Sequence, residues 1–375
     1  MNLFDVYPRY DIELVKGKGC YVWDKNDNKY LDLYCGHAVI SIGHSHPRYI
    51  SKVSNQLEQL GFYSNSVKIP IQEELAEKLG AISGYPDCSL FLCNSGAEAA
   101  ENAMKIASFH TGRMKIIAFE KGFHGRTSLA LAATDNAKIV APVNESENII
   151  RLPLNALDAV ASVMDNSIAG IIVEGIQGIA GIYEPTSEFL QGLAELCKEN
   201  GSLLILDEVQ SGYGRSGKFF AHQHHGIKPD LITTGKGMGN GFPVGGVLIS
   251  PEVKAWKGML GTTFGGNHLA CAAGLATLEV LEWESLIENA EQTGDYLMSA
   301  LRKIPEVKEV RGKGLMIGVE LEQLSGEIRK DLLFEHNIFT GSSDNAHTIR
   351  ILPPLSITKK EADPIIESLG KMLKS

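Results

Sequence analysis

Lys236 is surrounded by glycines in the stretch PDLITTGKGMGNGFPVGG, residues 229–246. Glycine is used where a backbone turns sharply or approaches another group closely, although it costs conformational entropy. A solvated surface loop would account for this composition. The alternative is a lysine that reaches a ligand which the backbone also touches, where its amine could act as a nucleophile and then as a base.

The stretch CNSGAEAAENAMK, residues 93–105, joins a strand pattern to a helical pattern. Its turn consists of Ser95, Gly96 and Ala97. The unpaired amides and the dipole at a helix N-terminus bind phosphate, and a serine hydroxyl beside them can donate as well. Taken alone, however, this turn is also what an ordinary helix cap requires.

Two more stretches carry groups that could meet the same ligand. Asp207 ends the apolar run SLLILDE, and ligands bind at the carboxyl ends of strands in open α/β sheets. In KGFHGRT, residues 121–127, Phe123 could stack on a planar ring and Arg126 could bind a carboxylate with two hydrogen bonds. Together with Lys236, these groups fit a planar cation with a phosphate tail, and pyridoxal phosphate (PLP) is such a molecule.

Two other interpretations of the chemistry are weaker. Residues 212–218 have the spacing of a phosphate-binding P-loop, but Phe219 stands where serine or threonine would hold Mg²⁺. The histidines of GHSHP and AHQHHG match no zinc signature, so no metal site is expected. A protein that binds such a ligand without catalysis is a further alternative, and the presence of Lys236, Asp207 and Arg126 argues against it.

Composition restricts the class of protein. The chain has 375 residues and a formal net charge of −10, which argues against a nucleic-acid surface. It shows neither a signal peptide at its start nor an apolar run of membrane-spanning length. Its six cysteines include no C-x-x-C pair and are expected to be reduced. We therefore expect a cytoplasmic protein with no membrane or nucleic-acid partner.

Short continuous apolar runs alternate with helical patterns through the middle of the chain. Such runs are typical of strands that are buried on both faces, and the alternation predicts an α/β fold with a mostly parallel sheet between helices. The predicted strands are residues 89–93, 115–120, 168–174, 202–208, 230–234 and 245–250. Helices are predicted to end at Gly112 and Gly201, because glycine commonly follows a helix C-terminus.

The two ends of the chain are predicted to form a smaller α+β unit. A long helical pattern after residue 267 would connect the large unit to strands in MIGVEL and TIRIL and to a helix from Lys359. GCYVWDKNDNKYLDL has the pattern of a hairpin that turns at residues 26–28. The expected division is 1–45 for the N-terminal segment of the small unit, 46–270 for the large unit and 271–375 for the connecting helix and the rest of the small unit.

The chain resembles the class III, fold-type I, PLP-dependent aminotransferases, and within them the acetylornithine, succinylornithine and ornithine branch. The likeness runs nearly end to end, and it implies a large domain with a seven-stranded sheet and a homodimer with shared active sites. The motifs that carry it are YLDLYCGHAVISIGHSHP, FLCNSGAEAAENAMK, FHGRT, VEGIQG, LLILDEVQSGYGRSG, PDLITTGKGMGNGFPVGG, GTTFGGNHLAC, RGKGLMIGVEL and IRILPPL.

The resemblance assigns a role to each candidate residue. For the cofactor, it implies Lys236 as the Schiff-base lysine, Asp207 on the ring nitrogen, Gln210 on the ring oxygen, Phe123 stacked on the ring, Ser95, Gly96 and Ala97 on the phosphate, and Thr263 on the phosphate of the other subunit. For the substrate, it implies Arg126 for one carboxylate, Thr262 as a further contact, and Arg350 for the α-carboxylate of glutamate and 2-oxoglutarate.

Three positions depart from the ornithine aminotransferases. Gly175 replaces a proline, and Ile179 replaces the glutamate that masks the second arginine when an ω-amino substrate binds. His37 replaces a tyrosine that meets free ornithine. The resemblance therefore implies transfer of the ω-amino group of N-acetyl- or N-succinylornithine to 2-oxoglutarate, in arginine metabolism. Ornithine δ-transamination and a 4-aminobutyrate-type reaction are the alternatives.

Overall fold

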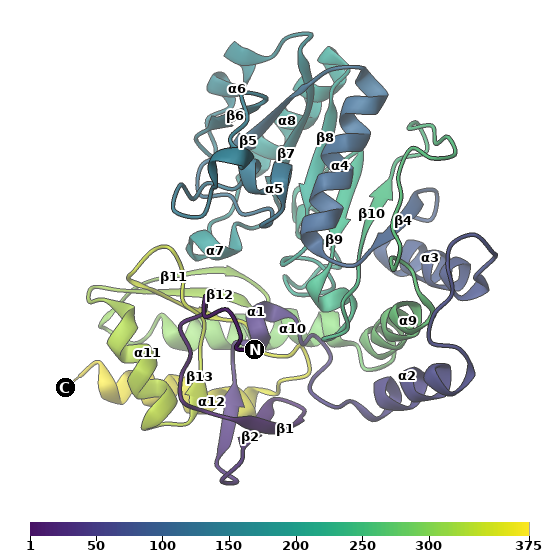
Figure 1. Ribbon diagram of the computed structural model, residues 1–375. Coiled ribbons are helices and arrows are strands. Elements are labelled where there is room, and N and C mark those ends of the chain that lie inside the picture. Colours follow the sequence, from purple (N-terminus) through teal and green to yellow (C-terminus); the bar gives the residue numbers. More distant parts are fainter. Residues whose placement is uncertain (375) are drawn as a thin grey trace.

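The computed structural model describes residues 1–374, and its largest layer is a seven-stranded sheet of order β4-β10-β9-β8-β7-β5-β6 (Figure 1). Only β10 runs antiparallel to its neighbours; the other strands are parallel to one another. The strands are β4 Ser89–Cys93, β5 Lys115–Phe119, β6 Ile149–Leu152, β7 Ile168–Glu174, β8 Leu203–Asp207, β9 Leu231–Thr234 and β10 Gly245–Ile249. The predicted mostly parallel α/β sheet is confirmed.

Strand β6 was absent from the predicted set. It lies at the edge of the sheet and pairs with β5 only. Its side chains are partly or fully exposed, and Arg151 interrupts its apolar residues. An edge strand of this kind leaves no continuous apolar run in the sequence.

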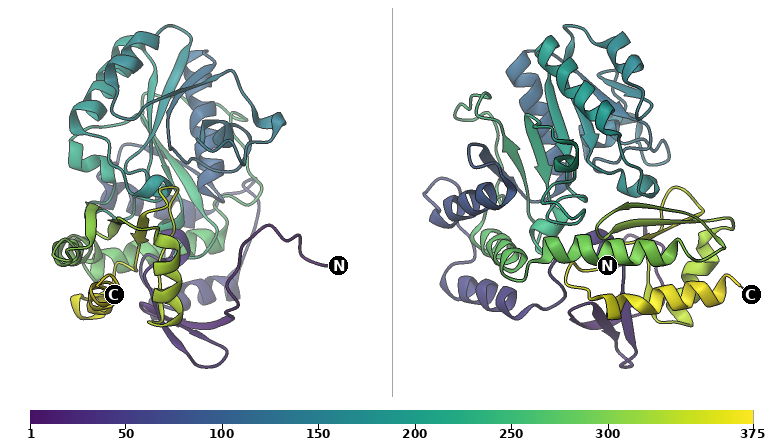
Figure 2. Two further views of the ribbon diagram at one scale, coloured as in Figure 1. Left: turned by 90° about the vertical axis from the view of Figure 1, so that its left-hand side faces the viewer. Right: turned by 180° about the vertical axis from the view of Figure 1, so that it is seen from behind.

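Helices cover both faces of the sheet, as the two rear and side views show (Figure 2). Helices α4 Gly96–Thr111 and α5 Ser128–Ala133 pack their alanines on one face, and α6 Leu157–Val163 and α8 Ser187–Asn200 pack on the other. Helix α8 begins and ends at capping residues, because the Thr186 hydroxyl accepts a hydrogen bond from Phe189 N and Gly201 adopts φ 64°.

The prediction of one long connecting helix is wrong, because two helices occupy this part of the chain. Helix α9 His268–Trp283 ends before Ser285, which adopts the left-handed region at φ 50°, and α10 Leu286–Leu301 then continues along the small unit. Helix α9 packs between α2 Pro47–Gln59 and α3 Pro70–Ser83. No helix among residues 1–374 is long and apolar enough to cross a bilayer.

Two small sheets lie below the large one in Figure 1 and draw on both ends of the chain. In one, β13 pairs with β3, an N-terminal strand; the other is antiparallel, in the order β11-β12-β14. The remaining elements are β1 Leu14–Lys18, β2 Tyr21–Asp24, β3 Lys29–Asp32, β11 Val307–Lys313, β12 Met316–Leu321, α11 Ser325–Phe334, β13 Ile338–Phe339, β14 Thr348–Ile351 and α12 Lys359–Met372. The division at 45/46 and 270/271 stays a prediction.

The turn α1, Cys35–Ala38, winds in the left-handed sense. All four residues have positive φ, from 54° at Cys35 to 69° at His37. Each non-glycine residue in this region costs roughly 1–2 kcal/mol, so neighbouring contacts must hold the turn. The Asp32 carboxylate accepts from Tyr34 N and Cys35 N, at 3.1 and 2.7 Å, and Gln210 Nε2 donates to His37 O at 3.1 Å.

Candidate active site

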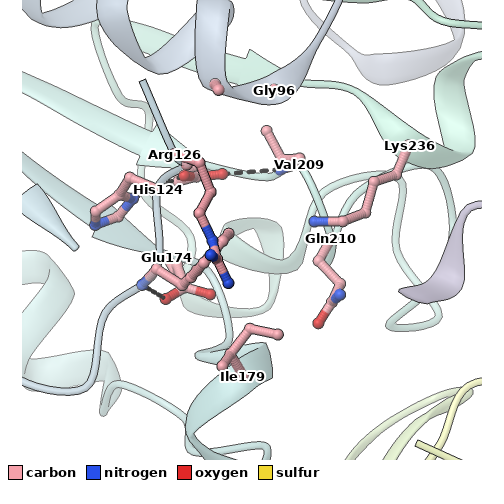
Figure 3. Close-up of a pocket in the computed structure, with 12 residues that line it drawn as sticks. Gly96, His124, Arg126, Glu174, Ile179, Val209, Gln210 and Lys236 are labelled. Atoms are coloured by element: carbon pink, nitrogen blue, oxygen red, sulfur yellow. Dashed lines mark hydrogen bonds and ion pairs between the residues drawn. The ribbon is translucent and has the colours of Figure 1, made fainter. Parts of the chain in front are cut away.

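A pocket of about 260 Å³ is lined by Glu174 and Asp207, the last residues of β7 and β8. Figure 3 shows the side chains that surround it. Sequence reasoning placed ligands at this edge of the sheet. Seven of the candidate residues line the pocket: Gly96, Ala97, Phe123, Arg126, Asp207, Gln210 and Lys236. The structure therefore brings together residues that are up to 140 positions apart in the chain.

The amine of Lys236 points into the pocket from the turn that follows β9 (Figure 3). Lys236 has φ 43°, a strained value for a lysine, and the flanking glycines allow the backbone to pass close by. A methyl group on Gly235 would lie 3.2 Å from Gly96 N. Burial lowers the pKa of the Lys236 amine, as does the charge of Arg350, whereas Asp207 and Glu174 raise it.

Asp207 lies at the base of the pocket and is buried. Its Oδ2 atom lies 2.7 Å from Nδ1 of His124, and its Oδ1 atom accepts from Val209 N at 3.0 Å. Burial opposes a charge on His124, but the hydrogen bond to Asp207 and the charge of that carboxylate raise the His124 pKa overall. The pair thus holds a negative carboxylate in place, ready for a cationic group.

Sequence reasoning missed His124 and Glu174 as members of the site. Both line the pocket, and Glu174 accepts from Phe123 N at 2.8 Å and from Gly178 N at 3.1 Å. Burial raises the pKa of Glu174 to about 7. A signal was present, because Glu174 ends the apolar run of β7 as Asp207 ends that of β8, and the two residues are paired neighbours in the sheet.

The N-terminus of α4 forms another wall of the pocket. Ser95 caps the helix through its hydroxyl, which accepts from Glu98 N at 3.2 Å, and the amides of Gly96 and Ala97 have no partner within the helix. A methyl group on Gly96 would lie 2.4 Å from the Val209 side chain. Glycine is therefore required there, and it leaves the backbone amides open to an anion.

Arg350 lies on β14 and is buried beside the pocket, where its Nη1 atom donates to Gln210 Oε1 at 3.3 Å. Its Nε donates to Ser342 O. Burial lowers the pKa of Arg350. Within residues 1–374, no carboxylate lies at ion-pair distance from Arg350, Arg126 or Lys236. Two guanidinium groups without ion pairs, one in the pocket and one beside it, fit a ligand that carries negative charges.

Thr262 and Thr263 lie outside this pocket in the single chain. The Thr262 hydroxyl accepts from Gly265 N at 3.0 Å, and it faces a separate hollow with Asn65 and Gln72. Thr263 is exposed on the same loop. Their expected contacts, Thr263 with the cofactor of the other subunit and Thr262 with substrate, stay predictions.

Of the three positions that depart from the ornithine aminotransferases, only Ile179 is among the residues that line the pocket. Ile179 lines the pocket on the short turn α7, Gly178–Gly181. Gly175 packs against Glu208, because a methyl group there would lie 2.7 Å from Glu208 Oε1. The His37 ring contacts Tyr34, and burial together with the charges of Arg350 and Lys236 lowers the His37 pKa to about 4.

The P-loop interpretation is wrong. Gly214 and Gly217 pack against Ile287 and Glu291 of α10, and only short turns follow them. One cluster, Asp32, Cys35 and His44, has the donor types of a metal site. Its carboxylate already bonds to two amides and to His44 Nε2, at 2.8 Å, and burial raises the pKa of the Cys35 thiol well above its usual value. The expectation of no metal stays a prediction.

The fold and the pocket define a class of protein: an α/β enzyme with a half-buried lysine and a buried aspartate at the carboxyl edge of its sheet. The model of the aminotransferase class-III family matches residues 6–373, so the chain belongs to that family and is a transaminase. It is 41% identical to the acetylornithine aminotransferases of Archaeoglobus fulgidus and Bacillus subtilis, with 98% and 99% of this chain and 96% of each relative covered.

The fold also matches solved structures. An ornithine aminotransferase from Toxoplasma gondii has a TM-score of 0.91 at 30% identity, with 99% of this chain and 92% of that one covered. The same enzyme, crystallised with oxidised glutathione, contains PLP at partial occupancy in its active site. Family and structure together imply PLP as the cofactor and small molecules as substrates.

Proposed function

We propose that this chain transfers the ω-amino group of an N-acylornithine to 2-oxoglutarate in the cytoplasm, as part of arginine metabolism. The observation that carries the proposal is the pocket that Lys236, Arg126 and Asp207 line together, with Arg350 beside it on Gln210 and, among the residues described, no ion pair on Lys236, Arg126 or Arg350. The curated relatives at about 40% identity, which are acetylornithine aminotransferases, support the same activity.

The residues present fit PLP. A helix N-terminus at Gly96 and Ala97, with Ser95, suits its phosphate, and Lys236 suits its aldehyde. Asp207 would face the ring nitrogen, Phe123 the ring and Gln210 the ring oxygen. When bound, PLP withdraws electrons from the substrate carbon that carries the amino group.

The side chains of this chain would supply the proton chemistry and the binding. Burial lowers the pKa of Lys236, so the amine can lose its proton and accept one from substrate. The Asp207 carboxylate, bonded to His124, would face the ring nitrogen and favour its protonated form. Arg126 and Arg350 would bind the substrate carboxylates, and Thr262 would add a contact.

The environment of Arg350 indicates which acyl group the substrate carries. Its partner at the pocket is the neutral Gln210, and Ile179 offers no carboxylate to neutralise it. A substrate that brings a carboxylate to Arg350 would gain a charge-assisted hydrogen bond, about 1.5–3 kcal/mol. N-Succinylornithine carries such a carboxylate and N-acetylornithine does not, so we expect succinylornithine to equal or exceed acetylornithine as a substrate.

Substrate preference is tested by the kcat/KM values for N-acetylornithine, N-succinylornithine, ornithine and 4-aminobutyrate. Either acylornithine is expected to exceed the last two. Ornithine is the second candidate substrate, because the Toxoplasma gondii structure, 30% identical to this chain, is named an ornithine aminotransferase. A clear preference for free ornithine would overturn the N-acylornithine proposal.

Cofactor attachment is tested separately. Borohydride treatment of the purified protein followed by peptide mass spectrometry is expected to find a pyridoxyl group on Lys236 and none in Lys236→Ala. Lys218→Ala is the matched control, because Lys218 also follows a glycine but is exposed. Absence of the group on Lys236 in the wild-type protein would refute the proposed role.

We also propose a homodimer in which Thr263 of each subunit reaches the other subunit's cofactor. Helix α2 has no buried residue in the single chain, which is unusual for an amphipathic helix. Phe62 and Phe264, both exposed, contact each other beside Thr263, with ring centroids 5.4 Å apart. An exposed apolar surface around the loop that carries Thr262 and Thr263 fits an interface with a second copy.

A further inference from the structure

The turn α7 carries Ile179 into the pocket, yet the small antiparallel sheet and the loop before β14 hold its carbonyls. Ile179 O accepts from Asp344 N at 2.9 Å, and Ala180 O accepts from Asn345 N at 3.3 Å. Gly181 O accepts from Nε of Arg311, on β11, at 2.8 Å. Consecutive carbonyls of one pocket wall therefore all bond to the unit that carries Arg350.

The backbone at the end of α7 needs these contacts. Ile182, fully buried, adopts φ 63°, which is rare for a β-branched residue. Residues in such conformations persist only where their surroundings over-determine them, and they cluster at functional sites. Strand β12 packs closely against this turn, because a methyl group on Gly318 would lie 2.9 Å from Gly181 O.

Arg311 bonds to the wall and to the strand of Arg350 at once. Besides its bond to Gly181 O, its Nη2 atom donates to Thr348 Oγ1 at 2.8 Å. Thr348 and Arg350 are two residues apart on β14, so their side chains leave the same face of the strand. The guanidinium also pairs with Glu320 at 2.7 Å, and only a planar group with several donors can satisfy these directions together.

We propose that Arg311 is a positioning residue that fixes the separation between Arg350 and the Ile179 wall, and so sets the space in which the site holds a dicarboxylate. The inference rests on the proposed role of Arg350 in binding a substrate carboxylate. Arg311 touches neither substrate nor cofactor; it acts through the backbone of α7 and through β14.

The test uses the purified holoenzyme and glutarate, a five-carbon dicarboxylate with no group that can undergo amino transfer. Calorimetry should show the glutarate Kd rising about tenfold in Arg311→Met, the equivalent of losing one hydrogen bond to a charged group. Thr348→Val, which removes one acceptor, should raise the Kd by less. Glu309→Gln is the matched control: it breaks only the exposed ion pair of Arg311 and should leave the Kd unchanged.

A purely structural role predicts a different pattern. Arg311→Lys keeps a charge beside Glu320, so its Tm should be higher than that of Arg311→Met. A lysine cannot reach Gly181 O and Thr348 together, so the variant should still bind glutarate more weakly than the wild type. In steady-state assays, the KM for 2-oxoglutarate should rise more than kcat falls. Should Arg311→Met fail to fold, Arg311→Lys and Thr348→Val give the same readouts.

The inference is overturned if the Arg311→Lys and Thr348→Val variants bind glutarate as the wild type does, or if the wild type binds none. Those results leave the proposed activity untouched. Conversely, a wild-type protein that binds glutarate through this arrangement but transfers no amino group would refute the proposed activity and uphold the role of Arg311.

Discussion

Asp207 lies among three ionisable residues of the pocket whose pKa values are shifted: His124, Glu174 and Lys236. Asp207 bonds to His124 and raises its pKa, and Asp207 and Glu174 both oppose the loss of the Lys236 proton. The Asp207 carboxylate thus bonds to His124 and also lines the pocket. A change to that one carboxylate should therefore affect catalysis more than folding.

Replacing Asp207 with asparagine tests its charge at nearly constant shape. The rate constant of amino transfer in a single turnover is expected to fall by about 10²–10⁴, the range for loss of a group that controls proton transfer. Borohydride labelling of Lys236 should persist. Asp230→Asn is the control, because Asp230 is a partly buried carboxylate that bonds to a backbone amide, Leu204 N, away from the pocket. A fall of only a few-fold would contradict the role of Asp207.

Glu174 predicts a pH dependence of the free energy of unfolding. Burial raises its pKa from 4.5 to about 7, so the folded protein binds this proton more tightly than the unfolded chain does. The stabilisation is complete below pH 4.5 and is lost as the pH rises toward 7. In urea unfolding of the cofactor-free protein, Glu174→Gln should lose less stability over this window than the wild type. Equal slopes, or no difference from the exposed control Glu195→Gln, would contradict this.

At the scale of elements, sequence predicts what local chemistry determines. Ser95 and Gly112 bound α4 as the capping pattern indicates, with Gly112 at φ 69°. The left-handed turn α1 was not predictable, because non-glycine residues such as Cys35 and His37 adopt it only under the constraint of bonds from Asp32 and Gln210. Those bonds come from the tertiary fold, and no local pattern encodes them.

Gly36 isolates the backbone cost of that turn. It has φ 56° and open space where a Cβ would be, so Gly36→Ala should destabilise the protein by about 1–2 kcal/mol through conformation alone. Gly370 also has open space but lies inside α12 without a positive φ, so Gly370→Ala should stabilise by about 0.5–1 kcal/mol. Urea unfolding measures both. A stabilising Gly36→Ala would show that the turn is not strained.

At the scale of the whole molecule, the site is assembled from distant parts. Lys236 and Asp207 come from the large sheet, and Arg350 comes from a small sheet whose strands include β11 and β12. Lys236 and Asp207 line one pocket and Arg350 lies beside it, whereas the roles that the motif resemblance gives them stay predictions. It did not identify Arg311, because hydrogen bonds to backbone carbonyls of α7 leave no side-chain signature in the sequence.

Mixed dimers test whether each site draws on two subunits. Lys236→Ala removes the amine from one subunit, and Thr263→Ala removes the proposed phosphate contact supplied to the other. Because a two-fold dimer has equivalent sites, a mixed dimer of these variants places both defects in one site and leaves the second intact. Mixing the two variants should therefore restore activity above that of either alone, at a level that follows the fraction of mixed dimers.

If each site lay within a single subunit, mixing the variants would restore no activity. Phe264→Glu places a charge in the exposed apolar surface beside Thr263, so it should abolish both the dimer and the restored activity.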